Sequence, residues 1–302
     1  MKRIDIKIGY NCNNKCAFCV QGDKRYKFAP RKFREISAIL RKGRRDGMAG
    51  VVFTGGEPTL HPDLLSAVRV AKKAGYRSIQ LQTNGRMLSY ENYCKKLITA
   101  GVNEFSPALH GSYAGLHDKL VGVRGAWSQV MRGMGHLKRL KQRVITNTVI
   151  TELNYKDLPQ IAHLLAGLGV SQMHFSFIHI CGTAQKNRHW IVPKKSNAMP
   201  FIKEALAIAR AARIPAYTEA IPFCLMDGYE ECISENIMPD TMIVDAEGVT
   251  QNYTEFRLHE GKAKAPKCKT CIRYKQCEGP WREYIELYGW REFKPIKRST
   301  KK

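Results

Sequence analysis

The sequence has no long apolar run and no apolar segment at its N-terminus. No stretch of eighteen consecutive apolar residues occurs among the 302 residues, so no transmembrane helix is expected. The first residues, Met1-Lys-Arg-Ile-Asp, lack the apolar core of a secretory signal. Ten cysteines, six of them in two tight clusters, suit metal binding in a reducing compartment better than a disulfide framework. We therefore predict a cytoplasmic protein.

Acidic side chains are scarce. Only 26 aspartates and glutamates oppose 50 lysines and arginines, which gives a formal net charge of +24. Such an excess attracts polyanions, for example RNA or an acidic peptide. The alternative is that the basic residues lie on solvated helix faces and only keep the protein in solution. They are densest in the stretches 24–45, 132–143 and 297–302.

Strand-like and helix-like patterns alternate from the start of the chain, and there is no internal repeat. Six β/α units in succession imply a parallel sheet with helices outside it. When such a sheet curls it forms a partial TIM barrel, whose chemistry lies at the C-terminal ends of the strands. The predicted fold class is therefore α/β, a partial (β/α)6 TIM barrel. The predicted strands are 4–9, 50–54, 77–82, 103–109, 143–150 and 172–178, and the predicted helices are 31–46, 62–74, 90–100, 126–141 and 156–168.

The pattern becomes less regular after residue 182. We place a domain boundary near residue 214, so that residues 1–214 form the barrel and residues 215–302 form a small cysteine-rich domain. In this part we predict, in order, a polar loop over 182–200, a helix over 200–213, a strand over 214–221, a hairpin around 246–248 and a short helix over 280–288.

Three cysteines, Cys12, Cys16 and Cys19, follow the first predicted strand with spacings of three and two residues. Three thiolates so close together can bind three corners of an iron–sulfur cube and leave the fourth iron without a protein ligand. An iron with an open position can bind a small molecule, whereas a fully ligated cluster mainly passes electrons. The alternatives are a structural zinc site, which usually needs four ligands in paired knuckles, or scattered buried thiols.

A glycine turn, Gly55-Gly56-Glu57-Pro58, follows the second predicted strand. Glycines there allow backbone amides and carbonyls to approach a ligand closely. The cysteine spacing, with Phe18 directly before the third cysteine, and this turn one β/α unit later together resemble the radical S-adenosylmethionine (SAM) superfamily. The resemblance covers roughly the first 180 residues as a barrel.

The resemblance implies a role for individual residues. Cys12, Cys16 and Cys19 would bind a 4Fe–4S cluster whose open iron chelates SAM. Phe18 would lie near the adenine, and Gly55, Gly56 and Glu57 would hold the methionine end. Further polar contacts to SAM would come from Thr83, Asn84 and Asn147, although Thr83 and Asn84 also fit a plain strand-ending turn. Ala108 stands where many relatives carry a serine that helps to hold the ribose.

The mechanism that the resemblance implies is reductive cleavage of SAM. The reduced cluster would pass one electron to the sulfonium, giving methionine and a 5′-deoxyadenosyl radical that abstracts hydrogen from a substrate. A low-potential donor of the flavodoxin or ferredoxin type would supply the electron. The protein would orient the reacting atoms and exclude solvent. His110, His117 and Asp118, after the fourth strand, could position substrate or move protons, or be ordinary loop residues.

A second group of cysteines, Cys268, Cys271 and Cys277, has the spacing C-x2-C-x5-C. This spacing resembles the SPASM and shortened "twitch" extensions of radical SAM enzymes, which hold an auxiliary 4Fe–4S cluster. Trp281 stands where a full SPASM domain has further cysteines, so one auxiliary cluster is expected. Cys224 is the first candidate for its fourth ligand and Cys232 the second. An open fourth iron and a zinc knuckle are the alternatives.

Three functions fit these features. The first is a radical SAM enzyme that modifies a peptide or protein side chain, because the SPASM-like tail is common in such enzymes; no peptide-recognition domain precedes the first strand, which counts against it. The second is modification of RNA or a nucleotide, favoured by the basic excess. The third is a non-catalytic iron–sulfur electron-transfer protein, which would not need the glycine turn at 55–56.

Overall fold

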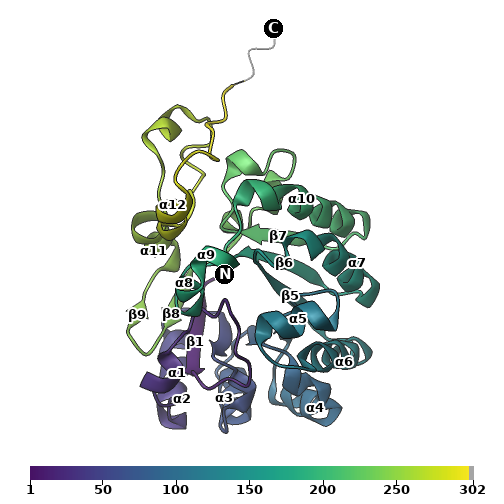
Figure 1. The fold of residues 1–302 in the computed structure, drawn as a ribbon. Helices are drawn as coiled ribbons and strands as arrows, with labels where there is room; N and C mark the ends of the chain where they lie inside the picture. Colours follow the sequence, from purple (N-terminus) through teal and green to yellow (C-terminus); the bar gives the residue numbers. More distant parts are fainter. Residues whose placement is uncertain (299–302) are drawn as a thin grey trace.

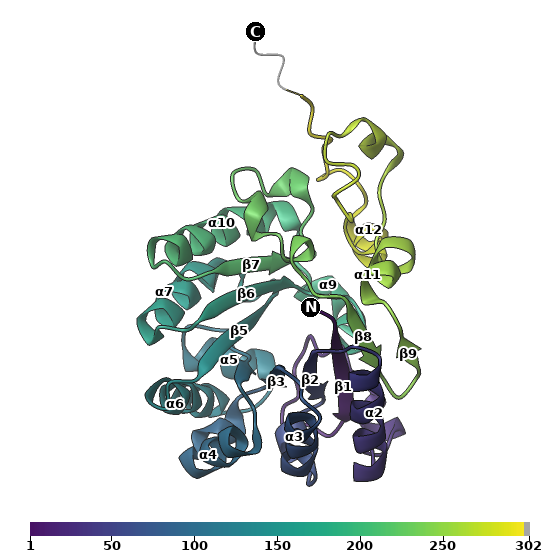
Figure 2. The same ribbon diagram turned by 180° about the vertical axis from the view of Figure 1, so that it is seen from behind.

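A computed structural model of the chain describes residues 1–298; residues 299–302 of the predicted basic tail lie outside the described part. Seven parallel strands stand in chain order in one curved sheet, and two more extend it beyond β1 in the order β7-β6-β5-β4-β3-β2-β1-β8-β9 (Figures 1 and 2). The seven strands in chain order are β1 (Arg3–Gly9), β2 (Gly50–Gly55), β3 (Ser78–Thr83), β4 (Glu104–Pro107), β5 (Arg143–Ile150), β6 (Gln172–Phe177) and β7 (Ala216–Glu219).

Helices cover the convex outer side of this sheet (Figure 2). The larger ones are α2 (Phe33–Arg45), α3 (Leu64–Lys73), α4 (Glu91–Ala100), α6 (Ala126–Arg139), α7 (Leu158–Leu168) and α10 (Lys195–Ala211). The shorter ones are α1 (Lys24–Lys27), α5 (Ala114–Val121), α8 (Thr183–Lys186), α9 (Arg188–Ile191), α11 (Tyr253–Phe256) and α12 (Arg282–Tyr288). The structure confirms the predicted fold class, an α/β partial barrel.

The two faces of the sheet differ in chemistry because of the alternation along the strands. In β1, Ile4, Ile6 and Ile8 have no exposed surface and pack beneath the helices. Burying an isoleucine side chain contributes about 1.5–3 kcal/mol, so this face supplies the core. The intervening residues Arg3, Asp5 and Lys7 point to the concave side and line an internal cavity. The barrel is therefore apolar outside the sheet and polar inside it.

After residue 182 the structure corrects the predicted loop and contains the predicted strand and hairpin. The polar loop predicted over 182–200 contains α8, α9 and the first turn of α10, which begins at Lys195. The strand predicted over 214–221 is β7, a seventh parallel strand beside β6. The predicted hairpin is β8 (Thr241–Val244) with β9 (Val249–Thr250), and β8 also pairs in parallel with β1. No local pattern reveals this last pairing, because its partners lie at opposite ends of the chain.

The division of the chain near residue 214 stays a prediction, and the structure adds that β7 and β8, both beyond residue 214, belong to the barrel sheet. None of the helices within residues 1–298 combines the length and the apolar character needed to cross a membrane.

A buried ionic network attaches the C-terminal segment to the barrel. Glu278 accepts two hydrogen bonds from the Arg257 guanidinium (2.9 Å each) and one from Lys262 (2.7 Å). Lys262 also donates to Glu235 (2.6 Å). All four side chains are at most 9% exposed. Burying such charges costs several kcal/mol each unless every one is paired, and here each is paired. The network fixes the residue that directly follows Cys277.

Candidate functional site

The first cysteine group lies in the loop after β1, and the structure brings all three thiols to one cavity. Cys12, Cys16 and Cys19 line a cavity of about 280 Å³ together with Gly55 and Gly56. The loop is held by backbone hydrogen bonds from Lys15 to Val121 (2.8 Å), from Ala17 to Leu120 (3.0 Å) and from Thr183 to Cys19 (2.8 Å). The end of α5 and the start of the segment at Thr183, after β6, thus position the predicted cluster ligands.

The glycine turn is where the backbone of the cysteine loop approaches β2. A Cβ atom on Gly55, whose φ is +125°, would lie 2.1 Å from the carbonyl oxygen of Gly9, and one on Gly56 would lie 2.3 Å from that of Tyr10. The Gly56 amide donates to Gly9 (2.9 Å), and the next amide donates to Asn11 (2.8 Å). No side chain fits at either position. The turn therefore serves the cysteine loop directly, besides presenting its backbone to the cavity.

The Glu57 side chain lies behind the turn rather than in the cavity. Glu57 is 3% exposed, and its carboxylate accepts hydrogen bonds from the backbone amide and the hydroxyl of Thr59. It also accepts from the Thr83 hydroxyl (2.7 Å) and from the backbone amide of Asn84 (2.6 Å). Burial raises the pKa of Glu57, and these hydrogen bonds oppose the rise. The side chain predicted to hold a ligand is thus a brace between β2 and the end of β3.

The other predicted polar contacts divide between two cavities. Thr83 and Asn84 line the cysteine cavity, and the side-chain nitrogen of Asn84 lies 3.8 Å from the Cys12 sulfur. Asn147 lines a different, neighbouring cavity inside the barrel, where it accepts a hydrogen bond from Ser176 (2.9 Å). The structure therefore places Asn147 apart from the cysteines.

Two neutral histidines form one wall of the cysteine cavity. The His117 Nδ1 accepts from the His110 amide (3.1 Å), and the His110 Nδ1 accepts from the Val149 amide (3.2 Å). Each ring therefore carries its proton on Nε2. Burial lowers the pKa of His110 well below its usual value and that of His117 to about 4. The buried Nε2 of His117 has no partner among residues 1–298.

Phe18 completes this wall. Its ring stands edge-on to His110, with centroids 4.7 Å apart, and the two imidazoles stack at 5.7 Å. Ala108, at the position where many relatives have a serine, lines the same cavity. The cavity thus has one flat, aromatic side and one side of backbone and thiols.

Two thiols of the first group, Cys12 and Cys16, are buried enough to resist ionisation on their own. Burial raises the pKa values of Cys12 and Cys16, and Arg25 opposes the rise. A bound metal reverses this balance because a coordinated thiol is deprotonated. The donor set, three thiols on one cavity wall, fits an iron–sulfur cube whose corners are separate irons. Among residues 1–298, no three histidine, cysteine or acidic side chains are arranged around one metal ion.

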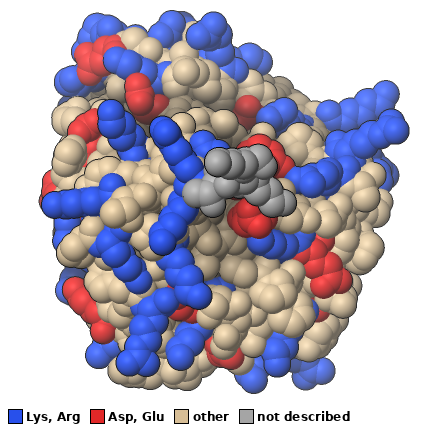
Figure 3. All heavy atoms as spheres, turned by 90° about the horizontal axis from the view of Figure 1, so that it is seen from above, with Lys and Arg blue, Asp and Glu red and all other residues tan. Residues whose placement is uncertain are grey.

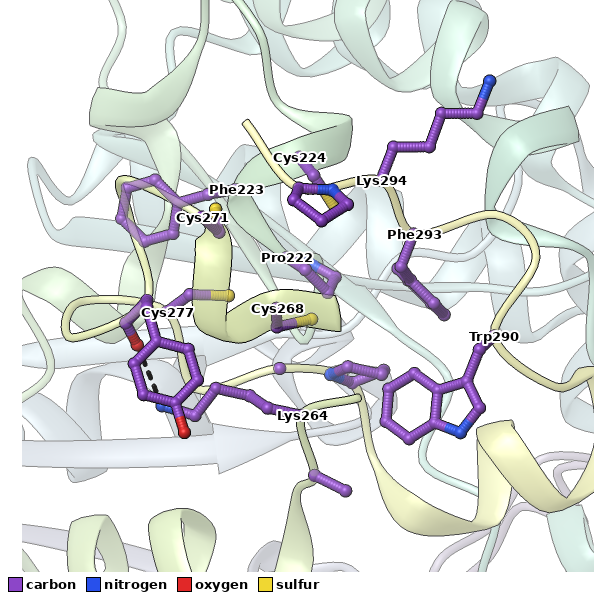
Figure 4. Close-up of a pocket in the computed structure, with 15 residues that line it drawn as sticks. Pro222, Phe223, Cys224, Lys264, Cys268, Cys271, Cys277, Trp290, Phe293 and Lys294 are labelled. Atoms are coloured by element: carbon purple, nitrogen blue, oxygen red, sulfur yellow. Dashed lines mark hydrogen bonds between the residues drawn. The ribbon is translucent and has the colours of Figure 1, made fainter. Parts of the chain in front are cut away.

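The second cysteine group gains a fourth member from a distant segment. Cys224 lines the same small apolar cavity, about 30 Å³, as Cys268, Cys271 and Cys277 (Figure 4). Backbone amides point at the sulfurs: Ile296 donates to Cys271 (3.3 Å), Lys294 to Cys224, and both Phe223 and Gly279 to Cys277. Such donors stabilise thiolates. Cys232 lies elsewhere, beside Glu231 and Arg210.

Sequence reasoning missed two residues that hold the cysteine loop. Arg86 donates to the Asn13 carbonyl and to the Asn14 side chain (3.2 Å), and nothing in its sequence context indicates this. Gly182 lies so close to the loop that a Cβ atom would meet the Val20 carbonyl oxygen at 2.5 Å. An isolated glycine just after a strand was the available signal for a close backbone approach.

Comparison with known protein families gives a match to the radical SAM superfamily over residues 6–165, more than half of the chain. A probable GTP 3′,8-cyclase from Saccharolobus islandicus is 29% identical over 184 residues, 60% of this chain and 58% of that protein. An AdoMet-dependent heme synthase from Oleidesulfovibrio alaskensis is 30% identical over 180 residues, 59% of this chain and 46% of that protein. The chain thus covers about half the length of these relatives.

Solved structures share the fold over almost the whole chain. SuiB from Streptococcus suis bound to S-adenosylmethionine aligns with a TM-score of 0.69 at 17% identity, covering 99% of this chain and 76% of that one. The enzyme anSMEcpe with bound AdoMet aligns with a TM-score of 0.65 at 14% identity, covering 93% and 90%. At such low identity the likeness establishes the fold, including the region of the second cysteine group.

The contact between the glycine turn and the cysteine loop yields a prediction. Gly56→Ala places a methyl group against the Tyr10 and Asn11 carbonyls, so it should lower the free energy of unfolding of the metal-free protein by about 1–3 kcal/mol. It should also reduce the iron bound after anaerobic reconstitution, because the cysteine loop is displaced. Denaturant unfolding and an iron count measure the two effects.

Gly167→Ala is the matched control, because a Cβ atom at Gly167 in α7 meets nothing within 4 Å. It should leave iron binding unchanged and stabilise the helix by up to about 1 kcal/mol. Equal stability and equal iron content in the two variants would contradict the role assigned to Gly56.

Proposed function

The chain belongs to the radical SAM superfamily, and from that premise we propose that it is an enzyme that uses a SAM-bound 4Fe–4S cluster to modify a peptide or protein side chain. The observation that carries the proposal is the convergence of Cys12, Cys16 and Cys19 with the Gly55-Gly56 turn on one cavity. An electron carrier needs thiols but not this cradle of backbone groups.

Each wall of the cavity has a role in this proposal. The three thiolates hold the cluster, and the exposed backbone of Gly55 and Gly56, with Thr83 and Asn84, receives the amino and carboxylate groups of SAM. On the opposite wall Phe18 and the stacked histidines present a flat face for the adenine. The Nε2 proton of His110 is available to an acceptor atom of the adenosine, in place of the group missing at Ala108.

When bound, the cluster supplies the electron that cleaves SAM into methionine and a 5′-deoxyadenosyl radical, which abstracts hydrogen from the substrate. The protein's part is to hold SAM in one orientation and to exclude water from the cavity. Because the histidines are neutral at physiological pH, we infer that they orient the nucleoside and do not transfer protons. A low-potential donor of the flavodoxin or ferredoxin type supplies the electron in this proposal.

We also propose that Cys224, Cys268, Cys271 and Cys277 bind an auxiliary 4Fe–4S cluster with no open iron. Four thiols share one cavity, and backbone amides already point at three of them. A fully ligated cluster passes electrons rather than binding substrate. Four cysteines also suit zinc, so the metal must be identified directly.

Two lines of support favour a peptide or protein substrate. The C-terminal cysteine region has the SPASM-like spacing. The structures that share the fold include SuiB bound to its precursor peptide SuiA, with a TM-score of 0.70 at 16% identity, and anSMEcpe with AdoMet and the Cp18Cys peptide. The sequence relatives are named for GTP and heme chemistry, and they match about 60% of this chain.

The first test is cleavage of SAM. The reconstituted protein, reduced with dithionite, should form 5′-deoxyadenosine, and Cys16→Ser should reduce the product to background because one of three cluster ligands is lost. Cys94→Ser changes a buried thiol outside both centres and should keep most of the activity. A wild-type protein that binds iron but forms no 5′-deoxyadenosine would favour the electron-transfer alternative.

The second test counts metal at the auxiliary centre. The wild-type protein and Cys232→Ala should each bind about eight irons per chain, and Cys224→Ala should bind about four. Metal analysis of all three gives the iron, sulfide and zinc content. About four irons in the wild type, with 5′-deoxyadenosine still formed, would remove the auxiliary cluster. A loss of iron in Cys232→Ala alone would reverse the ligand assignment.

A second candidate function, modification of RNA, is favoured only by charge. Lysine and arginine side chains are spread over the face in Figure 3, with few acidic groups among them, in a protein of net charge +24. Binding driven by phosphates weakens steeply with salt. A tRNA complex that still shifts in a gel at about 150 mM salt would support this function; the peptide proposal predicts no shift at that salt concentration.

A further inference from the structure

The interior of the barrel is an open polar chamber. A cavity of about 440 Å³ is lined by side chains from the concave face of β1 and β3 to β7. An ordinary TIM barrel fills this space with branched apolar side chains. Here most of these positions carry amides, hydroxyls and charges, while Val20, Ile145, Ile237, Met238 and Ile243 add apolar surface, so the space fits a ligand that has both polar and apolar parts.

The chamber adjoins the cavity of the first cysteine group. Asp5, Lys7, Val20 and Gln82 line both cavities. A group held in the chamber therefore lies directly next to the place where the proposed function puts SAM.

The chamber lacks the positive charge of the rest of the protein. Its lining includes the cations Arg3 and Lys7, the carboxylates of Asp5, Glu104 and Glu219, and His174, whose Nε2 lies 3.5 Å from the Glu219 carboxylate. The lining therefore carries one net negative charge when His174 is neutral and none when it is protonated, against +24 for the whole chain. Glu219 is ionised: although burial raises its pKa, His174 and the cations Lys262 and Arg257 lower it to about 2. A triphosphate would therefore find no net positive charge to bind in this lining.

The chamber also holds side-chain amides that the protein leaves unused. Gln80, Gln82 and Gln172 line it and make no side-chain hydrogen bond within residues 1–298. Each amide offers both donors and an acceptor. An apolar ligand would strip water from these groups without replacing its hydrogen bonds, at a cost of about 1–3 kcal/mol for each group. These amides therefore favour a ligand with hydrogen-bonding groups over one that is wholly apolar.

We propose that this chamber is the substrate site and that it takes a polar amino-acid side chain that donates hydrogen bonds, an ammonium or an amide, between Glu219 and the glutamine amides. The proposal rests on the proposed function and names the kind of side chain that the enzyme acts on. Glu219 selects for positive charge, and Gln82, at the border of the two cavities, holds the polar group beside the SAM cavity.

Saturation-transfer NMR on the reconstituted full-length protein with SAM bound tests the proposal, because it detects weak ligands. The probes are the Nα-acetyl amides of lysine, glutamine and leucine, and GTP, at about 150 mM salt, where surface charge is screened beyond roughly 8 Å. We expect saturation transfer to the lysine and glutamine probes, and none to the leucine probe or GTP.

Variants assign the binding to the chamber. Glu219→Gln should weaken the lysine probe about tenfold and leave the glutamine probe unchanged, whereas Gln82→Leu should weaken both. Glu204→Gln, an exposed glutamate on the outside of α10, is the control and should change neither.

Binding of GTP or of the leucine probe that is lost in Glu219→Gln or Gln82→Leu would overturn the proposal, and so would binding of the polar probes that neither variant affects. Absence of binding by all four probes would also overturn it. Failure of the proposed function has a separate readout: the wild-type protein would form no 5′-deoxyadenosine from SAM, independently of which probes bind.

Discussion

The carbonyl oxygens of Gly9 and Tyr10 lie where side chains on Gly55 and Gly56 would be, and the site depends on this close approach of two backbones. It brings the end of β1, and with it the cysteine loop, against the end of β2. The Glu57 carboxylate then braces the same turn against β3. Thiols and ligand-facing backbone groups thus share one cavity because two residues have no side chain.

The sheet separates stability from function by the direction in which its side chains point. Outward residues such as Ile4, Ile6 and Ile8 make the core, so the inward residues are not needed for burial and can be polar. At the second centre, stability comes from the buried network described above, which joins Arg257, Lys262, Glu235 and Glu278. This network fixes the segment around Cys277 without using the thiols. Both cysteine centres are therefore mounted on packing and ion pairs that do not involve their thiols.

The sequence predicts local features of this protein better than distant ones. Six strands, their helices and the two cysteine groups follow from periodicity and spacing. Cys224, the first candidate for a fourth ligand, lines the same cavity as Cys268, and its role as a ligand stays a prediction. The side-chain direction of Glu57 and the location of Asn147 in the chamber could not be predicted, because both depend on the three-dimensional course of neighbouring strands. The helices within 182–200 were missed because they are short and polar. The alternation of β1 indicates that Arg3, Asp5 and Lys7 share one face, but only the curved sheet shows that they line a cavity together with polar residues of β3 to β7.

The pairing of β1 with β8 has a consequence for synthesis of the protein. Arg3 and Thr241, which are hydrogen-bonded across this pair, are 238 residues apart in the chain. At the usual pace of translation, about 5–20 residues per second, the strand that leads to the cysteines waits roughly 10–50 s on the ribosome with one edge unpaired. An open strand edge invites association with other chains. That edge must therefore be kept from pairing with other chains until residue 244 has emerged. The risk of such association is greatest before the barrel is complete.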